Sequence, residues 1–372
     1  MRLKSILLVF ALIAGICTVS AQDDDTIAKP KVTTIEQLAQ RIADQKHNFQ
    51  VLEKKVEDVL LFEYLKDYAI IDKVRLTGPA RQPQNKEFRR TNDPFYDQFL
   101  DNEFKFYAYI FFPKDTKQNK KYPLIVMPHG GIHGTFSSGN RHFLRELLAQ
   151  GYIVVAPDYR GSTGYGKDCW QSIDYGGLEN EDVLEATKYM IENYSVVDKS
   201  RVGLMGWSHG GMISMMSACR YPDIYTCAYA GVPVSDVTFR LTYHSETYGK
   251  LFSDKYHIGK TPKEAPEEYA RRSPVTYAKD LRIPLMITTT ENDNDVWVKE
   301  VQRMIDALKS HNKAFEYKIY GPSKGAHFVD CIDSKDATER RFEAHKFLNR
   351  YLKPRKPFRS HEEMRKASYY FN

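Results

Sequence analysis

Ser208 is the residue whose type and surroundings best support chemistry. It lies in the stretch 202–211, V-G-L-M-G-W-S-H-G-G, where a short apolar run typical of a buried strand meets a G-x-S-x-G motif. Apolar and small residues at 212–217 favour a helix directly afterwards. Strand, sharp turn and helix together predict a nucleophile elbow, in which the serine hydroxyl stands clear of the sheet.

The neighbours of Ser208 fit this interpretation. Gly206 and Gly210 lack the Cβ atoms that would collide in a strained turn. The backbone N–H of His209 would point to the place where the oxyanion of an acyl-transfer reaction forms. We therefore expect Ser208 to be a nucleophile and His209 to be one oxyanion donor.

A second oxyanion donor is expected from the loop after the apolar strand 124–127. This loop reads P-H-G-G at 128–131, and its glycines let the backbone approach a substrate closely. An N–H from Gly131 or Ile132 would then face that of His209. The alternative for this stretch is an ordinary glycine turn.

A serine hydroxyl needs a base to take its proton, and a third group must orient that base. In a fold with this elbow the acid and the histidine follow the serine in that order. His327 lies in a glycine-flanked loop after the expected strand 315–320, and catalytic groups gather in loops past strand ends. We predict His327 as the base. The remaining histidines after the serine lack such a setting: His209, His244, His257, His311, His345 and His361.

The acid is expected in the loop T-T-E-N-D-N-D-V, which follows the apolar strand 285–288. It offers three carboxylates. We favour Asp293, with Asp295 next and Glu291 third, and the two that are not used would be solvated.

These residues need a scaffold, and from Glu103 onward the chain alternates strands with helices. This alternation predicts the α/β class, a mostly parallel sheet with helices on both faces, over a catalytic domain at 103–353. Expected strands are 104–112, 124–127, 152–156, 202–205, 225–232, 285–288 and 315–320. Expected helices are 143–148, 182–194 and 339–351. A polar insertion at 235–279 shows no obvious specificity pocket.

The N-terminal region is interpreted in two parts. Residues 1–21 have a basic start, an apolar core and a small-residue end, which predicts a signal peptide cleaved after Ala21 and an exported enzyme, periplasmic or secreted. An uncleaved membrane anchor is the alternative. Residues 22–102 are expected to form a helical extension and connection, with a helical pattern at 34–72 and an irregular stretch at 77–98. We expect this extension to pack on the main domain and to border the active-site mouth.

Composition excludes several function classes. Removing Arg2 and Lys4 lowers the formal net charge from +6 to +4, too little to suggest nucleic-acid binding. The basic stretch 354–372 is interpreted as a solvated tail, with a binding patch as the alternative. The glycines at 161–166 lack a phosphate-binding pattern, so no nucleotide cofactor is expected. Metal-site spacing is also lacking among the four cysteines left after cleavage, whose disulfide pairing stays open: Cys169, Cys219, Cys227 and Cys331.

Taken together, these motifs resemble the catalytic domain of the prolyl oligopeptidase family, nearest to its acylaminoacyl-peptidase and dipeptidyl-peptidase branches. The resemblance covers 103–353. It rests on P-H-G-G at 128–131, Y-R-G-S-T-G-Y-G at 159–166, G-W-S-H-G-G at 206–211, the stretch 272–285, D-N-D-V at 293–296 and G-A-H-F at 325–328. It implies a triad of Ser208, Asp293 and His327, because the family's acid stands three residues before the valine, here Val296.

The chain departs from the family pattern in three places. Ile132 replaces the usual proline, and Thr289-Thr290 replaces a His-Gly pair. A β-propeller pattern is missing, so the resemblance implies serine hydrolysis but not peptidase specificity. We predict an exported serine peptidase acting on short peptides. The alternatives are a carboxylesterase for acyl esters such as acylated carbohydrate, and an inactive hydrolase-fold binding protein. The expected partner is a small peptide or ester, without stable membrane insertion, and the oligomeric state stays open.

Overall fold

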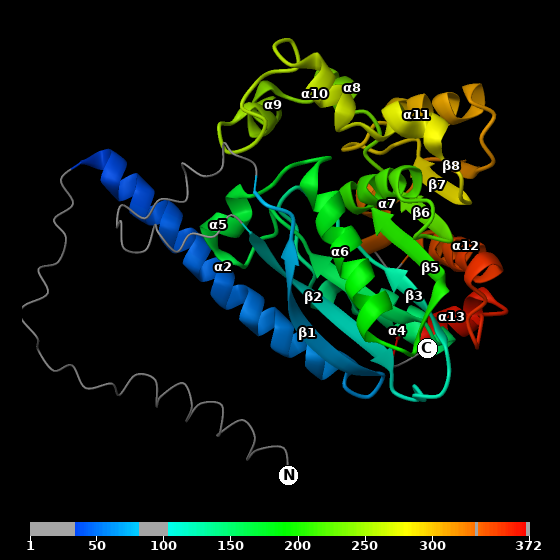
Figure 1. Ribbon diagram of the computed structural model, residues 1–372. Helices are drawn as coiled ribbons and strands as arrows, with labels where there is room; N and C mark the ends of the chain where they lie inside the picture. The colour runs from blue at the N-terminus through cyan, green and yellow to red at the C-terminus, as the bar shows by residue number, and fades with distance from the viewer. Residues whose placement is uncertain (1–33, 82–102, 332–333, 370–372) are drawn as a thin grey trace, which may run out of the picture. The chain divides into compact units, whose positions relative to one another are not determined.

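The seven predicted strands and one further strand, β1, form one eight-stranded sheet with the order β1-β2-β4-β3-β5-β6-β7-β8 (Figure 1). The computed structural model describes residues 34–81, 103–331 and 334–369. Pairing is antiparallel between β1, β2 and β4 and parallel from β4 through β8. The strands are β1 Ala69–Gly78, β2 Phe104–Pro113, β3 Tyr122–Val126, β4 Ile153–Asp158, β5 Val197–Trp207, β6 Cys227–Gly231, β7 Leu285–Thr290 and β8 Glu316–Tyr320.

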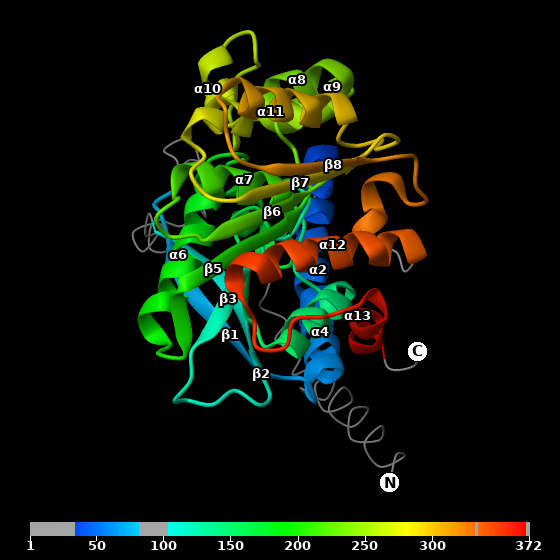
Figure 2. The same cartoon turned by 90° about the vertical axis from the view of Figure 1, so that its right-hand side faces the viewer.

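Helices cover both faces of this sheet, as the α/β-hydrolase prediction requires (Figures 1 and 2). One apolar core lies under α6 Leu178–Asn193, α7 His209–Arg220 and α11 Val298–Ser310. A second core lies under α4 Arg141–Gln150 and α12 Lys335–Leu352. The near-continuous burial of β3, β4, β6 and β7 follows from this two-sided cover.

The polar insertion between β6 and β7 forms short helices that lie together at one end of the sheet (Figures 1 and 2). They are α8 Val237–Tyr243, α9 Glu246–Ser253, α10 Pro266–Arg271 and η4 Pro274–Asp280. The remaining short elements are η3 Ser138–Asn140, α5 Gly166–Gln171, η5 Ala326–Cys331 and α13 His361–Ser368.

The N-terminal region differs from the prediction. Helix α2 Ile35–Leu65 ends before the predicted limit at Asp72, and β1 follows and pairs with β2 along its whole length. The helical pattern predicted for 34–72 is therefore confirmed over 35–65 and wrong over 69–72, and the irregular stretch predicted from residue 77 is wrong at 77–78, where β1 ends. An edge strand exposes part of its surface and carries charged residues, here Asp72, Lys73 and Arg75, which conceal the strand pattern.

Backbone contacts divide the chain at residue 45 into two units. Residues 46–372 form the larger unit, which contains the whole sheet. Of residues 1–45, only the beginning of α2 is described, so the signal peptide and the cleavage site after Ala21 lie outside the described residues. Within the described residues, α2 and the other helices are too short or too polar to span a lipid bilayer.

The solvated-tail prediction for 354–372 is wrong for its helical part. Helix α13 contacts α4, and both Met364 and Ser368 are buried. The hydroxyl of Ser368 donates to Glu146 on α4 (2.6 Å). A single methionine among basic residues was too weak a signal for packing, although Ser360 caps the helix by accepting the N–H of Glu363 (3.1 Å).

Three of the four cysteines can be placed. Cys169, Cys219 and Cys227 are buried free thiols, and burial raises the pKa of each well above its usual value. The side chain of Cys331 lies outside the described residues. Disulfides among the three placed cysteines are thus ruled out in this structure.

Candidate active site

Ser208 occupies the sharp turn between β5 and α7, as predicted. Its backbone has φ 54° and ψ −120°, a strained conformation for a residue with a side chain. A Cβ added at Gly206 would lie 2.2 Å from the carbonyl oxygen of Gly210, and one added at Gly210 would lie 2.2 Å from that of Pro128. Strand, helix and P-H-G-G loop therefore approach so closely that only glycine fits at both positions.

The three residues predicted to form a triad meet in one row. Ser208 Oγ lies 2.9 Å from His327 Nε2, and His327 Nδ1 lies 3.0 and 2.9 Å from the two carboxylate oxygens of Asp293. Because the carboxylate accepts the Nδ1 proton, Nε2 is left to accept the hydroxyl proton of the serine. His327 and Asp293 are both buried.

Asp293 is held by the backbone as well as by the imidazole. Its Oδ1 accepts the N–H groups of Asp295 (3.0 Å) and Val296 (2.8 Å). These bonds orient the carboxylate before any substrate binds. Glu291, the third-ranked acid, is exposed.

Asp295, the second-ranked acid, lies beside the opposite nitrogen of the same imidazole. Its Oδ2 is 3.5 Å from His327 Nε2, and its side chain is 40% exposed. The other oxygen binds the guanidinium of Arg240, a buried side chain that also donates to the hydroxyl of Tyr248 (2.7 Å). Burial would raise the pKa of Asp295, but Arg240 and His327 outweigh it and hold that pKa below its usual range.

The two predicted oxyanion donors lie on adjacent loops. Gly131 has φ 82° and follows Gly130, where an added Cβ would come within 3.5 Å of the Cβ of Ser208. The N–H of His209 is the first of α7, at the positive end of the helix dipole. Within the described residues, neither of these N–H groups has a hydrogen-bond acceptor, which leaves both available to an oxyanion.

The side chain of His209 braces this arrangement. Its ring nitrogens lie 3.2 Å from the carbonyl oxygen of Gly131 and 3.1 Å from Oε1 of Glu179. The ring also stacks on Tyr175, with centroids 4.2 Å apart. Glu179 and Tyr175 were missed from the sequence because nothing in their local pattern links them to the elbow.

Residues of the Y-R-G-S stretch hold the P-H-G-G loop in place by hydrogen bonds and ring stacking. His129 Nε2 lies 2.8 Å from Ser162 Oγ, and its ring stacks on Tyr159 at 4.2 Å. The hydroxyl of Tyr159 donates to the carbonyl oxygen of His129 (2.7 Å). Burial lowers the pKa of His129 to about 4. The imidazole is therefore neutral at pH 7 and acts as a structural group of the loop.

Aromatic side chains of the insertion stand next to Asp295. His244 Nε2 lies 3.0 Å from the carbonyl oxygen of Asp295, and the ring of His244 stacks on Tyr248 at 4.2 Å. Tyr243 stacks on Trp297 with centroids 4.4 Å apart. These rings form an aromatic cluster next to Asp295, which the composition of the insertion did not reveal.

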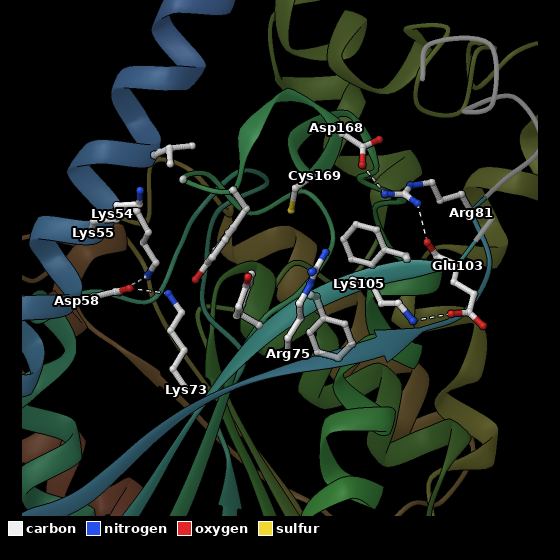
Figure 3. A pocket seen from close by; sticks show the side chains of 16 residues that line it. Lys54, Lys55, Asp58, Lys73, Arg75, Arg81, Glu103, Lys105, Asp168 and Cys169 are labelled. Atoms are coloured by element: carbon white, nitrogen blue, oxygen red, sulfur yellow. Dashed lines mark hydrogen bonds and ion pairs between the residues drawn. The ribbon is translucent and has the colours of Figure 1, made fainter. Parts of the chain in front are cut away.

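A separate cavity of about 680 Å³ lies between α2, β1, β2 and the loop before α5 (Figure 3). Its wall includes Lys73, which is 2.6 Å from Asp58, and Arg75, which points into the cavity. Burial lowers the pKa of Lys73 although Asp58 opposes the effect. Its charged lining residues are Lys54, Lys55, Asp58, Lys73, Arg75, Arg81, Glu103, Lys105 and Asp168. None of the three triad residues lines this basic cavity. No cluster of three or more His, Cys, Asp or Glu suited to a metal ion occurs within the described residues.

A serine, a histidine and an aspartate in one hydrogen-bonded row, at the turn between a strand and a helix of an α/β sheet, define a serine hydrolase. Residues 136–355 match the Prolyl oligopeptidase family, and the chain belongs to this family.

Known proteins of the same kind are larger. The mouse (Mus musculus) acylamino-acid-releasing enzyme is 28% identical over 237 residues, which is 62% of this chain and 32% of that protein. Human (Homo sapiens) dipeptidyl peptidase 8 is 34% identical over 152 residues, or 39% of this chain and 17% of that protein. The solved acylaminoacyl peptidase of Pyrococcus horikoshii superposes with a TM-score of 0.61 at 21% identity, covering 81% of this chain and 45% of that one. The chain thus spans about a third or less of the length of these curated relatives.

Proposed function

We propose that this protein is a serine peptidase that cleaves short peptides through an acyl-enzyme. The observation that carries the proposal is the row from Ser208 through His327 to Asp293, with contacts of 2.9 to 3.0 Å. His327 Nε2 takes the serine proton as Oγ attacks the scissile carbonyl, and the Asp293 carboxylate stabilises the imidazolium that forms.

The following steps use the same groups. The N–H groups of His209 and Gly131 receive the oxyanion of the tetrahedral intermediate. The imidazolium then protonates the leaving amine, which departs and leaves the acyl group on Ser208. Water, deprotonated in turn by His327, releases the acid and restores the free hydroxyl.

A peptide substrate is supported by what related proteins act on. Their names specify acylamino-acid release and dipeptidyl peptidase activity. One structural neighbour, an acylaminoacyl peptidase, was solved in complex with Z-Gly-Gly-Phe-chloromethyl ketone, a peptide-like molecule. The aromatic cluster next to Asp295 includes Trp297, which is 43% exposed and offers ring surface for a substrate side chain.

A panel of aminoacyl-amide and acyl-ester chromogens tests the proposal on the full chain. We expect amide turnover, abolished by Ser208→Ala, together with stoichiometric labelling of Ser208 by a fluorophosphonate. Turnover of esters without any amide would instead identify a carboxylesterase. A folded wild-type protein that the fluorophosphonate does not label would show an inactive binding protein and refute the proposal.

We also infer that the enzyme is exported through residues 1–21. The support is the order of a basic start, an apolar core and a small-residue end in the sequence. Expression with a C-terminal tag, fractionation and N-terminal sequencing test this. We expect a product beginning at Gln22 outside the cytoplasm, and a product that stays in the cytoplasm with residues 1–21 intact would contradict it.

A further inference from the structure

Helix α2 carries an apolar stripe that faces solvent. Its spacing alternates between three and four residues, so the stripe repeats every 3.5 residues, the period of a coiled-coil seam. Gln45 is the one polar member among the positions from 35 to 59. The apolar members are 48% to 83% exposed: Ile35, Leu38, Ile42, Phe49, Leu52, Val56 and Val59.

The opposite face of α2 packs against the protein over the residues of α2 that belong to the larger unit, 46–65. Lys54 and Leu61 lie seven residues apart on that face, and both are buried. Lys54 Nζ is 3.0 Å from the buried carboxylate of Asp158, and Leu61 belongs to the core under α4 and α12. On the stripe, Val56 and Val59 are 53% and 68% exposed and point away from the core. Contiguous exposed apolar surface of this kind marks an interaction site.

We propose that α2 forms a parallel two-stranded coiled coil with α2 of a second copy of this chain. In heptad notation, β-branched residues occupy most a positions, among them Ile42 and Val56. Leucine occupies two of the d positions, at Leu38 and Leu52. This combination favours parallel dimers.

Gln45 supports the parallel arrangement. It falls at a d position, where in a parallel pair in register it meets Gln45 of the second copy, and the two amides can hydrogen-bond to each other. In an antiparallel pair centred on the same stripe it would face Phe49 of the second copy and leave its amide without a partner, which is costly.

The stripe is large enough for a specific interface. The seven apolar side chains offer about 100 Å² each on burial, so a pair of helices would remove roughly 1,400 Å² from water, within the range of stable complexes. The same surface is used by both copies, as a two-fold dimer requires.

One charged pair makes the dimer dependent on salt. In a parallel pair, Arg41 at a g position faces Lys46 of the second copy at an e position, and these like charges repel. Salt screens this repulsion, so we expect the dimer to tighten as ionic strength rises. Arg41→Glu replaces the repulsion with an attraction and should tighten the dimer at low salt.

Sedimentation or light scattering on the full chain at about 50 µM tests the proposal. We expect a dimer for the wild type and a monomer for the double variant Leu38→Asp with Leu52→Asp, whose dissociation constant should rise at least about 100-fold. Gln37→Asp with Ala43→Asp is the matched control, since it adds the same two charges to exposed positions outside the seam. Circular dichroism and chromogen turnover verify that both variants fold. A monomeric wild type, or a double variant that dimerises as the control does, overturns the proposal.

Oxidation of Gln45→Cys tests the orientation. In a parallel pair in register the introduced thiols lie opposite each other and should form a covalent dimer on a non-reducing gel. The native thiols at 169, 219 and 227 are buried and serve as background in the wild type. A Gln45→Cys dimer that stays non-covalent overturns the parallel arrangement.

Discussion

Replacing Asp293 by asparagine should cost far more activity than the same change two residues later. Oδ1 of Asp293 accepts two backbone N–H groups, so the amide oxygen of Asp293→Asn must take that place. The amide NH₂ then faces His327 Nδ1, from the position that the second oxygen occupied at 2.9 Å. The amide NH₂ donates a hydrogen bond to Nδ1, so the imidazole proton must sit on Nε2. Nε2 can then no longer accept the proton of Ser208.

The expected loss follows from this wrong tautomer. A serine hydrolase loses roughly 10⁴-fold in kcat when its acid becomes an amide, which corresponds to about 5 kcal/mol of transition-state stabilisation. The loss should appear in kcat with little change in KM, because Asp293 is buried and does not line the substrate side of Ser208.

Asp295→Asn is the matched control. The Asp295 carboxylate is 40% exposed and lies 3.5 Å from His327 Nε2, so solvent weakens its effect to at most about 1 kcal/mol, or less than about tenfold in kcat/KM. Since this carboxylate favours the protonated imidazole, its removal should also move the acid limb of the pH profile to lower pH.

The assay is kcat/KM and kcat with an acyl-ester chromogen between pH 5 and pH 9, with thermal unfolding to verify that each variant is folded. A larger loss for Asp295→Asn than for Asp293→Asn would refute the assignment of the acid. Equal losses would show that the two carboxylates act as one unit, which the geometry does not allow.

Three further predictions concern the scaffold. Gly210→Ala should lower kcat by at least about 100-fold, because the added Cβ displaces the loop that carries an oxyanion donor. Steady-state kinetics measure this loss, and circular dichroism verifies that the variant is folded. Glu146→Ala should lower the free energy of unfolding by about 3–5 kcal/mol, because it removes a buried carboxylate that binds Arg341 (3.1 Å), His345 (2.9 Å) and Ser368 (2.6 Å). Urea unfolding measures this change, and a loss below about 1 kcal/mol would contradict the role of this carboxylate. Burial lowers the pKa values of His129 and His257 to about 4. The unfolded chain binds these protons more readily, so the free energy of unfolding should fall as pH drops from about 6.5 toward 4, by about 2 kcal/mol for each histidine at pH 4.5. A urea midpoint that does not fall between pH 7 and pH 4.5 would contradict it.

The catalytic row and the central sheet could be predicted because their signals are local. The elbow around Ser208 is encoded within about ten residues: two glycines, an apolar strand before it and a helix after it. His327 and Asp293 each follow a short strand, and strands of a parallel sheet bring their carboxyl ends to one edge. The structure places these three side chains in contact, while their roles in catalysis stay predictions until the variants are measured.

Other features depended on contacts between distant parts of the chain. The position of Asp295 beside Nε2 rather than Nδ1 follows from its bond to Arg240, 55 residues away. Likewise, Tyr159 and Ser162 support the P-H-G-G loop only because β3 and β4 pair in the sheet. Sequence spacing indicates that such residues are near a strand end, but not which atoms they meet.

The two N-terminal elements, β1 and α2, show the same limit. The charged residues of β1 conceal an edge strand, because a strand with one neighbour is stabilised by that neighbour more than by its own pattern. The apolar periodicity of α2 predicted that a helix forms there. Tertiary packing decided which face of this helix is buried: Lys54 and Leu61 face the protein, and the more apolar stripe faces solvent. By itself the sequence determined the chemistry and the central scaffold, since both are encoded by residues close together in the chain. Only the tertiary structure decided which face of each peripheral element is buried, because burial depends on the neighbours that folding brings.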